Sequence, residues 1–241
     1  MERVRSLTLI LSLYFLWNSL LSDPTKGFLG YSHSQMMTYV LGLALLRALV
    51  ITSRAFELTW EIAQGRLSHL LMRPMDLFAY QLSLDLSDKA VRVASAALEV
   101  AVLAYIFDAP LFVAHPASAL LAGVSVTLSV LLYFFIGLCM ASSGFWSSES
   151  VGFLWAAGLL IEFASGAFFP LDVLPDTLAH ALRLLPFPYL VYFPLNVYLE
   201  RFSDAEIAQG LILQSFWVVG CWLAARWIWR IGIKSYQAEG G

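Results

Sequence analysis

The sequence has few charged residues. Asp, Glu, Lys and Arg together make up only 13% of its 241 residues, about half of the roughly 25% found in a typical soluble domain. Hydrophobic residues make up 60% of the chain, which is more apolar surface than a soluble domain of this length could bury in one core. Because a lipid bilayer acts as an apolar solvent, we expect an integral membrane protein.

Basic residues and cysteines are also scarce. The formal net charge is −3, so no overall basic field favours nucleic acid. The two cysteines, Cys139 and Cys221, both lie in apolar runs, where a cysteine packs as a small hydrophobic residue. We therefore interpret neither cysteine as a metal ligand or a disulfide partner.

Motifs for nucleotide and metal chemistry are missing from the sequence. It contains no G-x-x-x-x-G-K-[ST] phosphate-binding loop, no H-E-x-x-H and no Cys-x-x-Cys, so we expect neither ATP hydrolysis by this chain alone nor a bound cofactor. The four histidines are scattered along the chain, which predicts no metal site. An intramembrane enzyme would need a convergent nucleophile, base or metal set, and the sequence offers none.

Long apolar runs, by contrast, are abundant. A helix needs roughly 20 mostly apolar residues to cross a bilayer, and six runs approach or reach this length. The predicted spans are residues 6–21, 36–53, 90–107, 117–141, 151–169 and 207–229. The first resembles a signal peptide but lacks a small-x-small cleavage site, so we retain it as a span. With no Pro/Gly/Ser linker, the fold class is a single all-α polytopic membrane domain over residues 1–241.

Lysine and arginine are distributed unevenly between the two predicted sides. With the N-terminus inside, the outer side carries only Lys26, Arg183 and Arg201. The inner side carries Arg3, Arg5, Arg54, Arg66, Arg73, Lys89, Arg92, Arg226, Arg230 and Lys234. Because cytoplasmic loops are enriched in these residues, we predict that both termini are cytoplasmic.

The inner connection between the second and third spans contains an amphipathic pattern. Glu61 to Arg73 predicts a short helix, which Pro74 discourages from continuing. Gly65 permits a close backbone approach, or a bend between two helical pieces. One face at i, i+3, i+4 spacing carries Leu67, Leu70 and Leu71. The pattern fits two alternatives, an interfacial helix on anionic lipid and a docking helix for a cytoplasmic partner.

The outer connection between the fifth and sixth spans is apolar, aromatic and interrupted by proline. Its prolines are Pro170, Pro175, Pro186, Pro188 and Pro194. Such a segment predicts short helices that dip into the outer leaflet, one of them at residues 176–185. Two alternatives remain, an outer cap with only a packing role and a gate for an amphipathic substrate.

Three charged residues fall inside the predicted spans. Arg47, Glu99 and Glu162 are unfavourable in hydrocarbon and should face protein, water or one another. We expect Arg47 to pair with Glu99 or with Glu162, either as a structural ion pair or as part of a substrate contact.

Three sequence patterns carry a family resemblance. The first is E-I-x-x-G-x-L-x-x-L-L-x-R-P at residues 61–74. The second is S-G-x-x-x-P-L-x-x-L-P at 165–175, followed by L-P-F-x-Y-L-x-Y-F-P at 185–194. The third is W-x-x-G-x-x-x-Y-x-x-x-G-G at 229–241. In order, spacing and predicted side they resemble the ABC-2 type permeases, most of all the compact six-span permeases of bacterial ABC exporters.

The resemblance implies a mechanism. Two permeases, identical or paralogous, would form a dimer surrounded by lipid in the bacterial cytoplasmic (inner) membrane. Each permease would bind an ABC ATPase subunit, and that subunit would hold ATP and Mg. The helix between the second and third spans would be the coupling helix, with Glu61, Gly65, Leu67, Leu71, Arg73 and Pro74 at or near the ATPase. The outer gate would be formed by Pro170, Pro175, Pro186, Phe187, Tyr189, Tyr192 and Pro194. ATP-driven closure would open the dimer toward the outer leaflet and release a hydrophobic or amphipathic substrate, such as a drug-like compound or lipid.

One feature of the family is missing at the start of the chain. Family members usually begin with an amphipathic connecting helix, whereas five residues precede Ser6. We expect either that the native N-terminus is longer or that this element is lacking.

Two other functions remain as alternatives to an ATP-driven exporter. A transporter driven by an ion gradient would require Glu99 and Glu162, although the sequence shows no matched pair of broken spans. A structural or assembly subunit would show neither transport nor ATP dependence.

Overall fold

The computed structural model describes residues 2–20, 30–147 and 151–236. Within these ranges the secondary structure is helical, with no strand, as the composition predicts. The side chains of residues 2–7, 9, 69, 71 and 151 lie outside the described part.

Six long helices each overlap one of the predicted spans. They are α1 (Glu2–Leu20), α2 (His33–Leu49), α5 (Leu77–Ile106), α6 (Pro116–Ala141), α7 (Val151–Ala164) and α10 (Asp204–Ser235). Among the described residues, Pro116–Phe145 and α10 are long and apolar enough to cross a membrane. That the other four helices cross the membrane stays a prediction.

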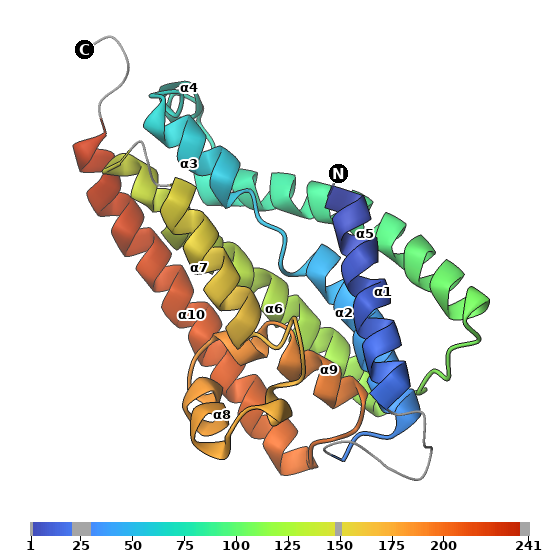
Figure 1. Cartoon of the computed structure of the whole chain (residues 1–241). Helices are drawn as coiled ribbons and strands as arrows, with labels where there is room; N and C mark the ends of the chain where they lie inside the picture. Colours follow the sequence, from blue (N-terminus) through green and yellow to red (C-terminus); the bar gives the residue numbers. More distant parts are fainter. Residues whose placement is uncertain (1, 21–29, 148–150, 237–241) are drawn as a thin grey trace.

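Helices α6 and α10 pack along each other (Figure 1). Gln214 of α10 is fully buried between them. Its side-chain amide donates to the carbonyl oxygens of Ser125 at 2.9 Å and Tyr189 at 3.0 Å, and the Ser125 hydroxyl donates back to its amide oxygen. Because buried polar groups in a bilayer need partners inside the protein, this network fixes α6, α10 and the segment around Tyr189 relative to one another.

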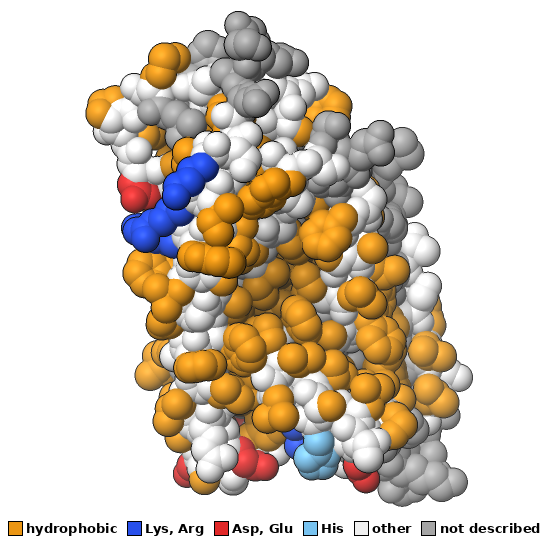
Figure 2. Space-filling model, turned by 90° about the vertical axis from the view of Figure 1, so that its left-hand side faces the viewer, with side chains coloured by type: hydrophobic (Ala, Val, Ile, Leu, Met, Phe, Trp, Pro, Cys, Tyr) orange, Lys and Arg blue, Asp and Glu red, His pale blue; other side chains and the backbone are white. Residues whose placement is uncertain are grey.

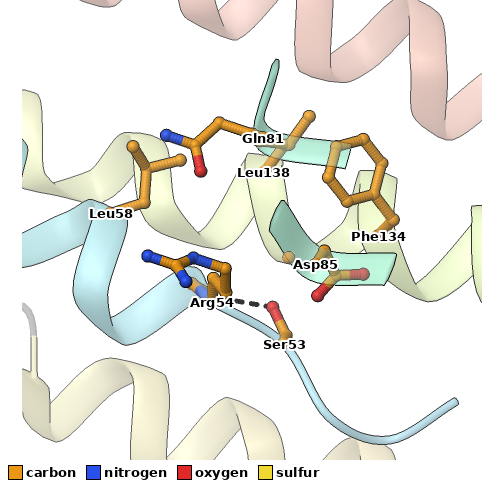
Figure 3. Close-up of a pocket in the computed structure, with 9 residues that line it drawn as sticks. Ser53, Arg54, Leu58, Gln81, Asp85, Phe134 and Leu138 are labelled. Carbon is orange, nitrogen blue, oxygen red and sulfur yellow. Dashed lines mark hydrogen bonds between the residues drawn. The ribbon is translucent and has the colours of Figure 1, made fainter. Parts of the chain in front are cut away.

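Helix α5 begins at Leu77, well before the predicted third span at residues 90–107, and where that span starts stays a prediction. Asp76 caps the helix by accepting a hydrogen bond from the backbone N–H of Ala79, which provides a start signal after Pro74. The polar residues that follow belong to the predicted inner connection, and Gln81, Asp85 and Lys89 among them are buried. Gln81 and Asp85 line a small pocket together with Ser53, Leu58, Phe134 and Leu138 (Figure 3).

The helix predicted at residues 61–73 is divided at Gly65. Two helices occupy this region, α3 (Ala55–Ala63) and α4 (Ser68–Leu71). Gly65 lies between them in the left-handed conformation, with φ of +71°. The N–H of Arg66 donates to the carbonyl of Glu61 at 3.0 Å, the bond typical of a glycine-terminated helix end. Of the two roles considered for Gly65, the bend is the one observed.

The outer connection is built from short helices broken by proline, as predicted. They are η2 (Leu171–Val173), α8 (Asp176–Arg183), η3 (Phe187–Tyr189) and α9 (Tyr192–Tyr198). Helix α7 ends at Ala164 rather than at the predicted residue 169, because Gly166 is left-handed (φ of +81°) and the Ala167 N–H bonds back to the Glu162 carbonyl.

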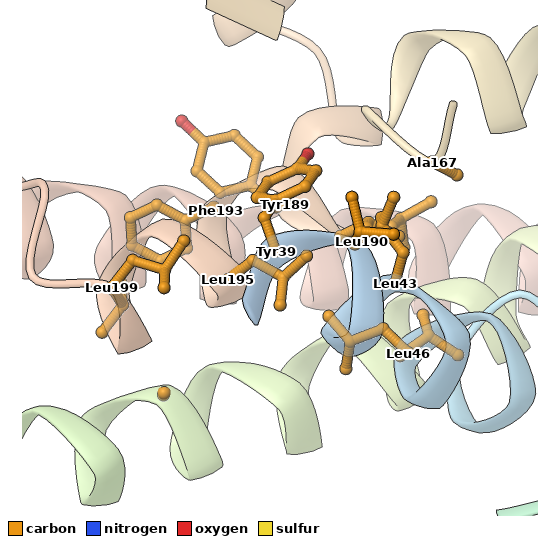
Figure 4. Packing of buried hydrophobic residues seen from close by; sticks show 14 of the residues in the cluster. Tyr39, Leu43, Leu46, Ala167, Tyr189, Leu190, Phe193, Leu195 and Leu199 are labelled. Carbon is orange, nitrogen blue, oxygen red and sulfur yellow. The ribbon is translucent and has the colours of Figure 1, made fainter. Parts of the chain in front are cut away.

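Helix α9 lies in the core between α2 and α6. Leu43 and Leu46 of α2 lie beneath Leu190 and Leu195, the latter on α9 (Figure 4). A Cβ at Gly42 would lie 2.6 Å from the Leu195 side chain, so α9 packs closely on α2 at that glycine. The outer connection is therefore part of the folded core.

The two ends of the molecule differ. Helices α3 and α4, the start of α1 and the end of α10 lie at one end, and α8 lies toward the opposite end (Figure 1). On the face shown in Figure 2, a continuous hydrophobic band lies between charged side chains above and below it. Exposed hydrophobic residues of α10 include Ile212, Phe216, Val219, Leu223 and Trp227, the arrangement expected of a lipid-facing surface.

Candidate functional site

The first candidate site is the end formed by α3 and α4. Helix α3 buries Leu58, Thr59 and Ile62 against the turn η1 (Ser142–Phe145) that follows α6. A Cβ at Gly144 would lie 2.7 Å from the backbone oxygen of Thr59. The backbones of α3 and η1 therefore touch at a position where only glycine fits.

Helix α4 is tied to the end of α10. The backbone N–H of Ser68 donates to the Tyr236 hydroxyl at 3.1 Å. The Tyr236 ring lies edge-on to Phe145 at 6.0 Å, and Phe145 lies edge-on to Trp229 at 5.0 Å. The structure therefore brings together the described residues of two of the sequence patterns, 61–74 and 229–236.

The predicted coupling residues divide into two groups at this end. Gly65 and Leu67 are buried and shape the turn between the helices, and Glu61 is half-buried. Arg73 and Pro74 are exposed. The side chain of Leu71 lies outside the described residues.

Three exposed hydrophobic residues at this end were missed by the sequence analysis. Trp60 of α3 is 52% exposed, and Met72 and Met75, after α4, are 75% and 38% exposed. Arg66 and Arg73 are exposed on the same two-helix segment. An apolar stripe in the sequence shows which residues share a face, but it does not show which face remains uncovered.

The second candidate site is the outer connection. Of the predicted gate residues, Pro170, Pro186, Tyr189, Tyr192 and Pro194 are buried. Phe187 is half-buried and Pro175 is exposed. The structure thus collects most of these residues in the packed core, and only Pro175 is exposed at the surface.

A carboxylate that the sequence analysis did not select links the parts of this end. Both oxygens of Asp172 accept tyrosine hydroxyls, from Tyr31 at 2.7 Å and from Tyr192 at 2.6 Å. Arg183 and Arg201 approach the same carboxylate within 4.0 Å. Asp172 therefore joins η2, α8 and α9 to the residue that precedes α2. The only available sequence signal was an acidic residue inside an apolar, proline-rich segment.

Arg201 reinforces this link. Its guanidinium lies 3.5 Å from the centre of the Tyr31 ring, a cation–π contact, and donates to the carbonyl of Gly30 at 2.6 Å. Burial and the neighbouring Asp172 raise the pKa of Tyr31 well above its usual range, so its hydroxyl remains a hydrogen-bond donor at all physiological pH values.

Arg47, one of the charged residues inside the predicted spans, pairs with Glu162. Its guanidinium lies 2.7 Å from the Glu162 carboxylate and also donates to the Ala167 carbonyl at 3.2 Å. Of the two partners considered from the sequence, Glu162 is therefore the one observed. Glu99 lies half-buried on α5. The Arg47 pair connects α2 to the end of α7, where the outer connection begins.

Metal-ligand geometry is not found in the described part of the chain. No group of three or more His, Cys, Asp or Glu residues there could hold a metal ion.

Comparison with known families gives one match over nearly the whole chain. The sequence model of the family described as "ABC-2 family transporter protein" matches residues 7–240. No curated protein sequence matches.

Proposed function

The chain belongs to the ABC-2 family of transporter proteins, whose model covers residues 7–240, and on this basis we propose that it is the membrane-spanning permease of an ATP-driven exporter. The family consists of membrane transport components rather than enzymes. In this proposal ATP and Mg bind to a separate ATPase subunit, and this chain supplies the transport pathway.

The α3–α4 end is the proposed docking site for that ATPase. The observation that carries this assignment is the exposure of Trp60, Met72 and Met75 beside Arg66 and Arg73. Aromatic residues, methionine and arginine are enriched at protein interfaces, and large hydrophobic residues exposed outside the membrane indicate a binding partner. This surface is fixed to the rest of the protein by the buried residues Gly65 and Leu67 and by the hydrogen bond between Ser68 and Tyr236.

Basic residues support the orientation that docking requires. Arg54, Arg66 and Arg73 belong to the α2–α5 connection at this end, and Arg230 and Lys234 to the last turns of α10. By the positive-inside rule this is the cytoplasmic side. The proposal therefore places six spans in a bacterial cytoplasmic membrane, with both termini inside.

The outer connection is the proposed exit. Its aromatic core suits a hydrophobic or amphipathic substrate, and a second permease, identical or paralogous, would complete the pathway. In this proposal the contacts of Asp172 and of the Arg47–Glu162 pair hold the short helices in place until transport begins. Because Glu162 already has a fixed cationic partner, the structure gives no support to its use as a carrier in gradient-driven transport.

The proposal is tested by affinity purification from native membranes, followed by mass spectrometry. We expect an ATP-binding subunit with the wild-type chain and its loss from Met72→Glu. Val113→Glu serves as the matched control, because Val113 is 83% exposed in the α5–α6 connection. A well-folded wild-type preparation without any ATPase, or equal retention by Met72→Glu and Val113→Glu, would overturn the proposal.

A further inference from the structure

Two opposite charges are buried where α5 meets the segment between α2 and α3. The exposed fractions of the Lys89 and Asp85 residues are 1% and 3%. The Lys89 ammonium lies 2.5 Å from the Asp85 carboxylate. The same ammonium donates to the backbone carbonyl of Thr52 at 2.6 Å. One side chain of α5 thus holds a main-chain atom of the linker formed by residues 50–54.

Stability alone is a weak reason for this arrangement. Removing a charge from water carries a penalty of several kcal/mol, and well-packed apolar residues in place of a buried ion pair are often equally stable. An ammonium with directional donors differs from an apolar contact in one respect. Its hydrogen bonds to Asp85 and to the Thr52 carbonyl hold only at short range, so they favour one arrangement of the linker against α5.

A second tie binds the same linker to the same helix. Arg54, which directly precedes α3, donates to Asp88 of α5 at 2.9 Å. Gln81 and Asp85 line the pocket beside Arg54 (Figure 3). The spacing of Gln81, Asp85, Asp88 and Lys89 corresponds to one face of a helix, so a single face of α5 holds the linker at several points.

Helix α6 closes the other side of the linker. A Cβ at Gly137 would lie 2.5 Å from the Ser53 hydroxyl, so the linker passes directly over the α6 backbone. Ser53 also accepts a hydrogen bond from the N–H of Ala55, the first residue of α3. Since α3 starts where the linker ends, a displacement of α3 must move the linker, and α5 is bound to the linker by charged hydrogen bonds.

We propose that Asp85 and Lys89 are positioning residues that transmit the movement of the α3–α4 end to α5. This inference rests on the proposed function, because the movement comes from the ATPase that docks there. Docking itself uses exposed residues, whereas transmission uses this buried pair. Loss of the pair should therefore separate ATP hydrolysis from the movement of α5.

The test uses the purified complex of permease and ATPase in lipid nanodiscs. Spin labels at Tyr105→Cys on α5 and Ile212→Cys on α10, both exposed sites, report the distance between the helices by pulsed electron paramagnetic resonance. Cys139→Ala and Cys221→Ala remove the native thiols. The distance distribution is compared without nucleotide and after trapping with ATP and vanadate.

The decisive variant is Asp85→Leu/Lys89→Met, which replaces the ion pair by apolar residues of similar size. We expect it to retain the ATPase and to hydrolyse ATP, but to lose the distance shift shown by the parent complex. The control Ser83→Leu/Ser87→Met has the same spacing on the exposed side of α5 and should keep the shift. A shift that persists in the Asp85/Lys89 variant, or a parent complex that shows no shift, would overturn the inference.

A second variant keeps the test valid if the Asp85/Lys89 variant fails to assemble with the ATPase. Asp88→Asn weakens the other tie at a side chain that is about half exposed (51%), where folding tolerates change. A reduced shift with normal ATP hydrolysis supports transmission through the linker, and an unchanged shift contradicts it. Absence of any ATPase from the parent preparation would instead contradict the proposed function.

Discussion

The hydroxyl of Tyr31 donates a 2.7 Å hydrogen bond to Asp172, which lies 141 residues further along the chain. Tyr31 precedes α2, and Asp172 lies in the first short helix of the outer connection. The bond joins two parts of the outer end that no local sequence pattern connects. Tyr192 uses the second oxygen of the same carboxylate, so one side chain links Tyr31 to both η2 and α9.

Asp172→Asn should therefore destabilise the protein. A hydrogen bond to a charged group contributes about 1.5–3 kcal/mol, and the amide also leaves Arg183 and Arg201 without their anion. We expect a loss of roughly 2 kcal/mol in the free energy of unfolding, measured as a lower thermal midpoint in detergent. Asp176→Asn, at the exposed start of α8, is the control, and equal midpoints for the two variants would contradict this role.

Arg47 and Glu162 should behave as a coupled pair. Neutralising either residue leaves the other without its partner, a change that costs about 3–5 kcal/mol for a fully buried pair. Because these side chains are 18% and 21% exposed, we expect on the order of 2 kcal/mol for Arg47→Gln or Glu162→Gln. The double variant should lose less than the sum of the two, as measured by a double-mutant cycle. Strictly additive losses would show that the pair does not contribute to stability.

Gly144→Ala should damage the α3–α4 end. The added Cβ would lie 2.7 Å from the Thr59 carbonyl oxygen, and a backbone atom cannot move aside without shifting α3. We expect less monodisperse protein on size-exclusion chromatography and weaker recovery of the ATPase. Gly158→Ala on α7, where the new Cβ meets nothing within 4 Å, should behave like wild type. The proposed packing would be contradicted if Gly144→Ala did so too.

Gln214→Leu should loosen the packing of α6 against α10. The substitution leaves the Ser125 hydroxyl without its acceptor and removes the bond to the Tyr189 carbonyl. Polar contacts between membrane helices contribute about 0.6 kcal/mol on average and at most about 2, so we expect a loss of about 1 kcal/mol in unfolding free energy. Gln209→Leu, on the exposed side of α10, provides the comparison, and no difference between the two would exclude the anchoring role.

Hydropathy predicted the helical class and the approximate places of the six long helices, because apolar length is a local property. It did not show that α5 extends back to Leu77, into the predicted inner connection, where the buried Asp85 and Lys89 pair with each other. Periodicity also merged α3 and α4, since the spacing of leucines does not reveal that Gly65 adopts the left-handed conformation.

The sites were less predictable than the fold. The family resemblance selected the segments that form the two candidate sites, but it grouped buried residues such as Leu67 with exposed ones such as Arg73. Asp172 was not selected, because its importance depends on partners that come together only after folding. The exposure of Trp60 and Met72 likewise depends on which sides of α3 and α4 the rest of the chain covers.

The most direct test of the central claim is site-specific photo-crosslinking in intact cells. A benzophenone amino acid replaces Met72 at the α3–α4 end or, as the control, Val113 at the other end of α5. We predict that the label at position 72 crosslinks to an ATP-binding subunit and that the label at position 113 does not. If position 72 forms no such crosslink, or if both positions form it equally, the α3–α4 end is not the docking site for an ATPase.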